Sequence, residues 1–330
     1  CSVKEDDNFD IETTPEIESK PDYFLEIPEN IKKIVLDHPK VFKANLDPTD
    51  HIDLAKIPGY AGYEEGIKIE IQPNAKPVAN HHLRASPLHY ADKITKMYQT
   101  LVEQEVVRKV LPNEVCEWVS PSRVVVKPTS TVENPQLRVV SDLRNLNKVV
   151  NRKPYPFPNI ERTRAQIPIN TRIMAKIDLK AAYHQLKVHV DSQKYLNFQS
   201  PIGILQYLKI PMGLRSSGDF LCDITKTIFT EARNVNLIQS IDDYLICATS
   251  MNDLTIQLKE VIRVAEKYGV VFNIEKIEVG SKLVYVGMQI KCRENGPPVI
   301  SPDPKNIKAL GAIPIPKNKK ELRQFLGLAN

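Results

Sequence analysis

The stretch Gln239-Ser240-Ile241-Asp242-Asp243-Tyr244-Leu245-Ile246 places two adjacent carboxylates inside an otherwise apolar run. The flanking residues 235–241 and 244–248 are apolar enough to form the two strands of a hairpin. Adjacent aspartates repel one another and suit a strand poorly, so either a turn exposes them or a cation neutralises them. A solvated hairpin tip and a cation site are both open at this point.

The composition is that of a globular chain with room for two or three subdomains, since 42% of the 330 residues are hydrophobic and 26% are charged. No apolar run approaches the length of a membrane span and the first residues are acidic, so we expect neither a transmembrane helix nor a signal peptide. The five cysteines are far apart and form no C-x-x-C pair, which favours a reducing, intracellular compartment.

Charge is distributed unevenly along the chain. Residues 1–22 contain eight acids and two lysines, a net charge of −6, and we expect them to form a disordered acidic linker. Because the whole chain has a net charge of +5, residues 23–330 carry +11. This charge is compatible with a polyanionic partner such as nucleic acid, and equally with an ordinary basic surface.

Periodicity and turn residues predict alternating helices and strands. The expected helices cover residues 28–43, 87–105, 160–167, a segment from Ser216 or Ser217 to Phe229, a segment capped by Asn252 or Asp253 and ended by Gly269, and 319–330. The expected strands are 66–71, a hairpin of 119–127 with 137–144, 173–178, 202–208 with 210–213, the two arms around Asp242, 270–274, and 282–290. This order indicates an α+β fold built on a mixed sheet with helices on one face.

Asp178 ends the predicted strand 173–178, where a carboxylate usually either caps the next turn or faces a site. Asp178 and Asp242 are expected on neighbouring strands. Three carboxylates at one sheet edge suit a pair of divalent cations, and Mg²⁺ prefers carboxylate oxygens shared with substrate phosphates.

An ordered series of motifs across roughly residues 30–330 resembles the reverse transcriptases of Ty3/gypsy-type LTR retroelements. The series is Trp118-Val119-Ser120-Pro121, residues 137–147, residues 177–185 around Asp178, Pro211-Met212-Gly213-Leu214, Ile241-Asp242-Asp243, Gly287 and residues 321–328. The resemblance implies a right-hand polymerase, part of a Pol polyprotein, with fingers and a ferredoxin-like (RRM-like) palm made of an antiparallel sheet with helices packed on one face.

The resemblance also divides the chain. It implies an N-terminal extension (23–86), fingers (87–170), a palm (171–280) with a fingers-related segment at about 186–210, and a primer-grip hairpin leading into the thumb (281–330). The chain ends at Asn330 within what resembles the first thumb helix, so we expect a fragment with an incomplete thumb that binds template and primer weakly.

Site roles follow from the same resemblance, position by position. Asp178, Asp242 and Asp243 correspond to the catalytic palm carboxylates and metal ligands, and Lys276 corresponds to a general acid for pyrophosphate. The residues matching the nucleotide-binding positions are Lys127, Arg138, Tyr183, Met212 and Gly213, and those matching the primer grip are Tyr285, Val286 and Gly287. A phenol ring at Tyr183 would clash with a ribose 2′-hydroxyl, which favours deoxynucleotides.

Three departures from the family pattern stand out. Ser240 replaces the usual aromatic residue two places before the first aspartate of the pair, and Lys127 is followed by Pro128-Thr129-Ser130-Thr131 instead of further lysines. The stretch 215–220 differs from the common Asn-Ala-Pro form, and Asp219 within it and Asp223 shortly after it are interpreted as residues on a helix surface.

The predicted function is an RNA-directed DNA polymerase that uses two Mg²⁺ ions, with Mn²⁺ as an alternative, to add dNTPs to a primer on an RNA or DNA template. A related alternative, an RNA-directed RNA polymerase, shares the carboxylates but conflicts with Tyr183. The alternative from another class is a catalytically decayed or domesticated element that only binds nucleic acid. The resemblance places the protein in the cytoplasm, a virus-like particle or the nucleus, with no membrane partner.

Overall fold

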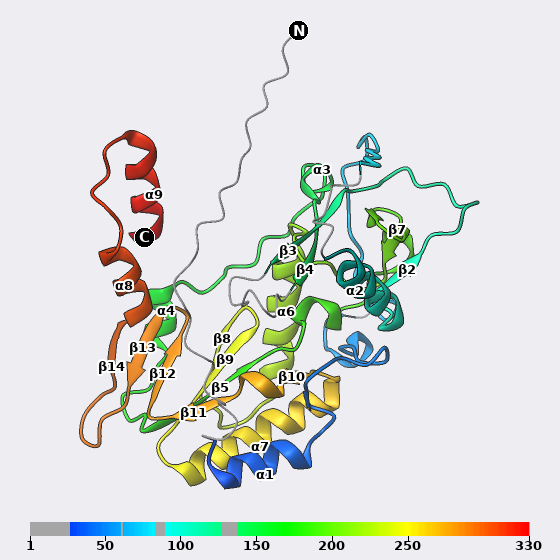
Figure 1. Ribbon diagram of the computed structural model, residues 1–330. Helices are drawn as coiled ribbons and strands as arrows, with labels where there is room; N and C mark the ends of the chain where they lie inside the picture. The colour runs from blue at the N-terminus through cyan, green and yellow to red at the C-terminus, as the bar shows by residue number, and fades with distance from the viewer. Residues whose placement is uncertain (1–26, 61, 83–89, 127–136, 330) are drawn as a thin grey trace.

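The computed structural model describes residues 27–60, 62–82, 90–126 and 137–329 (Figure 1). Its helices are α1 (Glu29–Asp37), α2 (Ala91–Glu103), α3 (Arg144–Asn147), α4 (Ile160–Ala165), α5 (Val190–Gln193), α6 (Ser217–Phe229), α7 (Met251–Tyr268), α8 (Pro304–Gly311), α9 (Lys319–Ala329) and the 3₁₀ turns η1 (Leu54–Lys56), η3 (Ala182–Gln185) and η4 (Ile274–Lys276). Its strands are β1 (Phe42–Lys43), β2 (Val107–Lys109), β3 (Ser122–Val126), β4 (Leu137–Ser141), β5 (Ile173–Asp178), β6 (Asn197–Ser200), β7 (Gly203–Tyr207), β8 (Leu237–Ser240), β9 (Asp243–Ala248), β10 (Phe272–Asn273), β11 (Glu278–Gly280), β12 (Lys282–Tyr285), β13 (Met288–Lys291) and β14 (Val299–Pro302).

A four-stranded antiparallel sheet in the order β11–β5–β9–β8 positions the site. Along the chain it is built as β5, α6, β8, β9, α7 and β11, two strand–helix–strand units joined by the β8–β9 hairpin. The sheet is antiparallel throughout, as the family resemblance implies, so the mixed sheet expected from the order of the elements is wrong. Each neighbouring pair runs antiparallel because β8–β9 is a hairpin and β11 returns beside β5 in the opposite direction.

Both faces of this sheet are buried, because alternate residues of a strand point to opposite sides. Ile177 and Ile246 pack in the main core, to which α6 and α7 contribute their apolar faces. Met174 and Leu245 face the other way, into a second cluster with Leu283 from the three-stranded sheet β12–β13–β14. The helices therefore cover one face, as predicted, and a small sheet covers the other (Figure 1).

The remaining pairings form separate small sheets. β2, β7 and β6 form a three-stranded sheet, β3 and β4 form the predicted hairpin, and β1 pairs in parallel with β10. Of the two short strands predicted at 202–208 and 210–213, the first is β7, which pairs with β6 and ends at Tyr207, and the second is wrong, because residues 211–213 turn instead.

The alternating segment 66–71 is not a regular strand. Its isoleucines are buried or half-buried as expected, but it makes only isolated bridges, from Ile67 to Val188 and from Ile71 to Val150. Gly66 lets this segment pass closely: its φ is +122°, and a Cβ there would lie 2.8 Å from the backbone of Val188. The alternation of apolar and polar residues in this segment thus indicates which side chains are buried, but not that the segment belongs to a sheet.

The N-cap of helix α7 lies two or three residues before the predicted caps Asn252 and Asp253. Ser250 is the N-cap, and its hydroxyl accepts a hydrogen bond from the Asp253 amide at 3.1 Å. Asp253 reciprocates by accepting the Thr249 amide at 2.8 Å. The predicted end at Gly269 is confirmed, because this residue closes the helix with a φ of +73°.

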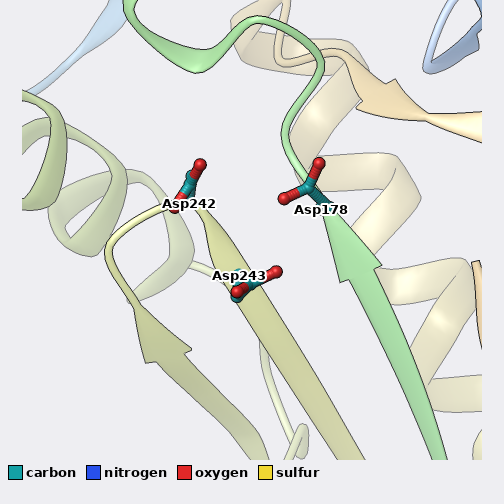
Figure 2. A group of neighbouring side chains, drawn as sticks. All are labelled: Asp178, Asp242 and Asp243. Atoms are coloured by element: carbon teal, nitrogen blue, oxygen red, sulfur yellow. The ribbon is translucent and has the colours of Figure 1, made fainter. Parts of the chain in front are cut away.

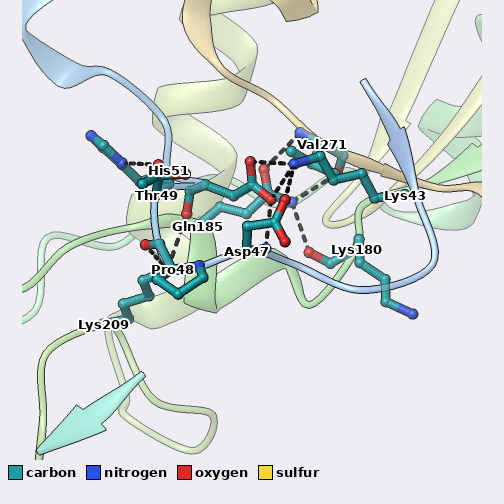
Figure 3. Close-up of polar contacts among 10 residues, drawn as sticks. Lys43, Asp47, Pro48, Thr49, His51, Lys180, Gln185, Lys209 and Val271 are labelled. Atoms are coloured by element: carbon teal, nitrogen blue, oxygen red, sulfur yellow. Dashed lines mark hydrogen bonds and ion pairs between the residues drawn. The ribbon is translucent and has the colours of Figure 1, made fainter. Parts of the chain in front are cut away.

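The segment 43–53 is tied to the loop after β5 and to the residues preceding β10 (Figure 3). Gln185 is fully buried. Its Nε2 donates to the carbonyls of Lys180 and Val271, each at 2.8 Å, and its Oε1 accepts the Val271 amide at 2.9 Å. Lys209, only 3% exposed, donates to the carbonyls of Pro48 and Asp50 at 3.3 and 3.1 Å. These bonds join segments that are far apart in sequence.

Across the described residues, none of the helices combines the length and the apolar character needed to cross a bilayer.

Candidate metal and nucleotide site

The three aspartates singled out by the sequence meet at one edge of the central sheet (Figure 2). Asp178, the last residue of β5, lies directly opposite Asp243, the first residue of β9. Asp242 stands in the two-residue turn that joins β8 to β9, and one carboxylate oxygen from each aspartate lies within 4.8 Å of the others. The prediction that Asp178 and Asp242 lie on neighbouring strands is nearly right. Strands β5 and β9 do pair, but Asp242 lies in the turn one residue before β9.

The turn carries backbone strain at its first residue. Ile241 has a φ of +55°, a left-handed conformation that is uncommon for a β-branched side chain and costs about 1–3 kcal/mol. In this conformation the turn closes over two residues, so that Ser240 pairs with Asp243. Asp242 is thereby held at the tip, beside Asp178.

The electrostatics of the cluster show a site that favours added positive charge. Burial, and next the nearby charge of Asp178, raise the pKa of Asp242 above its ordinary value. The same two causes, in the same order, raise the pKa of Asp243 to about 6. Carboxylates that are held together and partly desolvated in this way gain most from a bound cation.

Among the described residues, Lys276 forms an ion pair with the cluster. Its Nζ lies 2.7 Å from Oδ2 of Asp178, although the side chain is otherwise exposed. Lys276 follows the predicted strand 270–274 and lies in η4, where the side chain of Asn273 accepts the Glu275 amide at 3.1 Å and starts the turn. One ammonium group cannot balance three carboxylates, and the set of oxygen donors suits Mg²⁺.

Tyr183 lies beside these carboxylates. It belongs to η3, which starts after Ala181, whose φ is +43°, and turns the chain sharply after β5. Burial, and next the charge of Asp242, raise the pKa of Tyr183. The side chain is half-buried and lies within reach of the charge of Asp242.

The turn at Met212 and Gly213 is held by Asn147. The side-chain amide of Asn147 donates to the Gly213 carbonyl at 2.8 Å, and its oxygen accepts the Arg215 amide at 2.8 Å. Gly213 has a φ of +87° and Met212 is exposed. This role of Asn147 was not predicted from the sequence. The residue lies in the motif 137–147, in α3 shortly after the β3–β4 hairpin, and its polar side chain was the feature that could have indicated it.

Arg138 and Lys127 are the two nucleotide-binding residues predicted on the hairpin of 119–127 with 137–144. Arg138 is exposed on β4, opposite Val125, and its charge is among those that favour ionised Asp242. Lys127 lies outside the described residues. Arg138 is therefore within electrostatic reach of the cluster.

The β12–β13 hairpin contacts the strands β8 and β9, between which Asp242 lies. Tyr285 is fully buried, and its hydroxyl lies 3.0 Å from the carbonyl oxygens of both Ile238 and Asp243. Val286 and Gly287 form the turn with φ of +47° and +71°. Of the three residues predicted for the primer grip, Gly287 is exposed and Val286 half-buried, whereas the Tyr285 side chain is enclosed.

Asp219 corrects an interpretation made from the sequence. It is not on the helix surface but only 4% exposed, and it pairs with Arg152, whose Nε lies 2.6 Å from Oδ2. Asp223 does lie at the surface, where it accepts a hydrogen bond from the hydroxyl of Tyr60. Neither residue belongs to the carboxylate cluster.

The fold and the cluster together define an α+β protein with a candidate metal site of three aspartates at a sheet edge. Residues 125–327 match the family described as "Reverse transcriptase (RNA-dependent DNA polymerase)", and the chain belongs to this family.

Known relatives agree with this family. Over 295 residues the chain is 29% identical to the Transposon Tf2-3 polyprotein of Schizosaccharomyces pombe, covering 88% of this chain and 21% of the polyprotein. It is 28% identical, with the same coverage, to the Tf2-7 polyprotein of that organism. The chain spans about a fifth of the length of these relatives. The predicted relation to Ty3/gypsy-type retrotransposons is confirmed.

Solved structures share the fold. The foamy viral protease-reverse transcriptase in complex with an RNA/DNA hybrid has a TM-score of 0.72 at 16% identity, covering 96% of this chain and 41% of that one. A second structure, that protein's dRH form in complex with double-stranded DNA, gives 0.72 at 17% identity over 97% of this chain and 54% of that one.

Proposed function

We propose that the protein is an RNA-directed DNA polymerase that extends a primer on an RNA or DNA template with dNTPs. The observation that carries the proposal is the meeting of Asp178, Asp242 and Asp243 at one sheet edge, in a chain of the reverse transcriptase family. Nucleotidyl transfer needs closely placed carboxylates of this kind, because two divalent cations must be held near the reacting phosphate.

The three aspartates would hold two Mg²⁺ ions, or Mn²⁺ in their place, through their carboxylate oxygens. When bound, these ions supply Lewis-acid chemistry: they ease deprotonation of the primer 3′-hydroxyl and stabilise the leaving pyrophosphate. The raised pKa of Asp243 supports this assignment, since a cation would offset both the burial and the repulsion from Asp178 that raise it.

The remaining site residues divide by role. Lys276, paired with Asp178 at 2.7 Å, is positioned to donate a proton to pyrophosphate once that pair opens. Arg138 and Lys127 would bind the triphosphate by charge-assisted hydrogen bonds. Tyr183 would exclude a ribose 2′-hydroxyl, and Met212 with Gly213 would pack near the nascent base pair.

The regions follow the right-hand plan. The sheet β11–β5–β9–β8 with α6 and α7 has the connection order of a ferredoxin-like fold and would serve as the palm, within 171–280. Residues 87–170 would form the fingers; the pairing of β2 with β7 supports adding the segment 186–210. Residues 23–86 would be the N-terminal extension, and the β12–β13 turn, Val286 and Gly287, would touch the primer end before the thumb.

The partner would be a template–primer duplex. The related foamy viral structures are complexes with an RNA/DNA hybrid and with double-stranded DNA, and the net charge of +11 on residues 23–330 suits a polyanion.

Extension of a labelled primer on an RNA template with dNTPs and Mg²⁺ tests the proposal. We expect extension by the wild type and at least an about 100-fold loss in Asp242→Asn, because a ligand of the catalytic ions is worth several kcal/mol in the transition state. Asp37→Asn, an exposed aspartate at the end of α1, is the matched control and should retain activity. A folded wild type that binds the duplex without extending it would favour the alternative, a decayed or domesticated element that only binds nucleic acid.

A further inference from the structure

Asp219, in the first turn of α6, is the most enclosed carboxylate in the described part of the chain. Its two oxygens accept hydrogen bonds from Arg152, Nε at 2.6 Å and Nη2 at 2.9 Å. Oδ1 also accepts the backbone amide of Tyr155 at 2.8 Å. A bidentate pair of this kind fixes orientation as well as distance.

These bonds pin an extended segment across the start of α6. Residues 152–157 lie between α3 and α4 and belong to no helix or strand. Asp219 grips this segment at Arg152 and at Tyr155, and the ring of Tyr155 packs edge-on against Phe157, with centroids 5.7 Å apart. Phe157 therefore takes its position from a segment that one carboxylate holds.

Gly218, the neighbour of Asp219, shows where the Phe157 ring lies. A Cβ at Gly218 would lie 3.3 Å from Cζ of Phe157 and 3.9 Å from the hydroxyl oxygen of Tyr183. The Phe157 ring and the Tyr183 hydroxyl thus border the same point on the surface of α6. Tyr183 in turn lies within reach of the charge of Asp242.

We propose that Asp219 is a positioning residue for sugar selection: by holding Arg152 and the Tyr155 amide, it seats Phe157 beside Gly218, where the ring limits movement of Tyr183. This inference rests on the proposed function, since it explains what keeps the selecting ring in place. Phe157 is 38% exposed and packs against the ring of Tyr155, whose amide Asp219 holds, so its position depends on the hydrogen bonds of Asp219.

The test compares Asp219→Asn with the wild type in single-nucleotide extension, measuring kcat and KM for a dNTP and for the matching rNTP. We expect the preference for dNTP over rNTP to fall about tenfold, mainly through KM, because small misplacements of positioning groups have effects of this size. Phe157→Leu should reproduce the fall, and Asp219→Asn combined with Arg152→Gln should add little to either single change, since both remove one interaction.

Glu114→Gln is the matched control. It removes a comparable bidentate pair, with Arg108, at 2.7 Å and away from the cluster, and should leave the preference unchanged. Rescue of the preference by Asp219→Glu over Asp219→Asn would support a role for the charge.

Amide hydrogen exchange gives a readout without activity, because the Tyr155 amide should exchange at least about tenfold faster in Asp219→Asn than in the wild type. An unchanged exchange rate would overturn the positioning role directly. An Asp219→Asn variant that extends primers with wild-type preference and KM would overturn the role in selection. A wild type that extends no primer would contradict the proposed function, and the exchange rate would still decide whether Asp219 holds the segment.

Discussion

At the scale of single residues, Asp243 differs from its neighbour Asp242 in what surrounds it. Asp243 lies in the β5–β9 ladder opposite Asp178, whereas Asp242 stands at the tip of the turn. Burial and the charge of Asp178 raise the pKa of Asp243 to about 6. In the absence of a cation, an ionised Asp243 therefore costs the folded protein free energy.

This imbalance predicts the effect of Asp243→Asn. Because the pKa of Asp243 is higher in the folded than in the unfolded chain, its penalty is absent below about pH 4, grows as the pH rises to about 6, and is complete above that. With EDTA present, we expect the variant to be more stable than the wild type by about 1 kcal/mol at pH 7. This value is smaller than the full pKa shift implies, because Asp243 is partly exposed and solvent screens its charge. Urea unfolding between pH 4 and 8 measures this; a wild type that is the more stable at pH 7 would contradict it.

The sequence predicted the site unevenly at this scale. Asp178, Asp242 and Asp243 were recognisable because each stands within a short local motif. The burial of Asp219 was missed because its partner Arg152 lies 67 positions away, and no local pattern reports such a pair. Asn147 was missed for the same reason, since the turn it holds lies 66 positions further along.

At the scale of elements, the long amphipathic helices were the most predictable. Helices α6 and α7 have apolar residues at helical spacing, and α6 occupies the predicted residues 217–229. The segment 66–71 failed because alternation records which side is buried and cannot tell a ladder from isolated bridges.

The end of α7 offers a test of close packing. Gly269 has a φ of +73°, and a Cβ there would lie 2.6 Å from the carbonyl oxygen of His51. We expect Gly269→Ala to lower the free energy of unfolding by at least about 2 kcal/mol, from backbone strain and from this clash. Gly296→Ala shares the strain, with a φ of +99°, but meets nothing within 4 Å. Equal losses in the two variants, measured by urea unfolding, would show that the clash contributes nothing.

At the scale of the whole molecule, the family resemblance predicted an antiparallel central sheet with its helices on one face. It did not predict that β12–β14 would cover the other face, because the residues against which these strands pack, such as Met174 and Leu245, are distant in sequence. Nor did it predict how the segment 43–53 is tied to the rest of the fold. The Ile52 amide donates to the Gln185 carbonyl, and the buried Lys209 donates to the carbonyls of Pro48 and Asp50, so these bonds join positions far apart in sequence (Figure 3).

Gln185 is the centre of this connection. Its amide satisfies three backbone groups, at Lys180 and Val271, and its own carbonyl accepts the Ile52 amide at 2.8 Å. We expect Gln185→Leu to lower the free energy of unfolding by about 3 kcal/mol, because the Lys180 carbonyl and the Val271 amide lose this partner, while the Val271 carbonyl retains the Lys180 amide. The exposed Gln166→Leu is the control. A loss below about 1 kcal/mol in a denaturant titration would show that these groups find other partners.

Manganese binding tests the central claim most directly, because it asks whether the aspartate cluster holds divalent cations. Electron paramagnetic resonance would follow free Mn²⁺ during titration of the protein bound to an RNA template, a dideoxy-terminated primer and the next dNTP. We predict that the wild type binds Mn²⁺ at least about tenfold more tightly than Asp178→Asn or Asp242→Asn, and that Asp37→Asn binds like the wild type. Equal binding by all four proteins would contradict the assignment of Asp178, Asp242 and Asp243 as a metal centre.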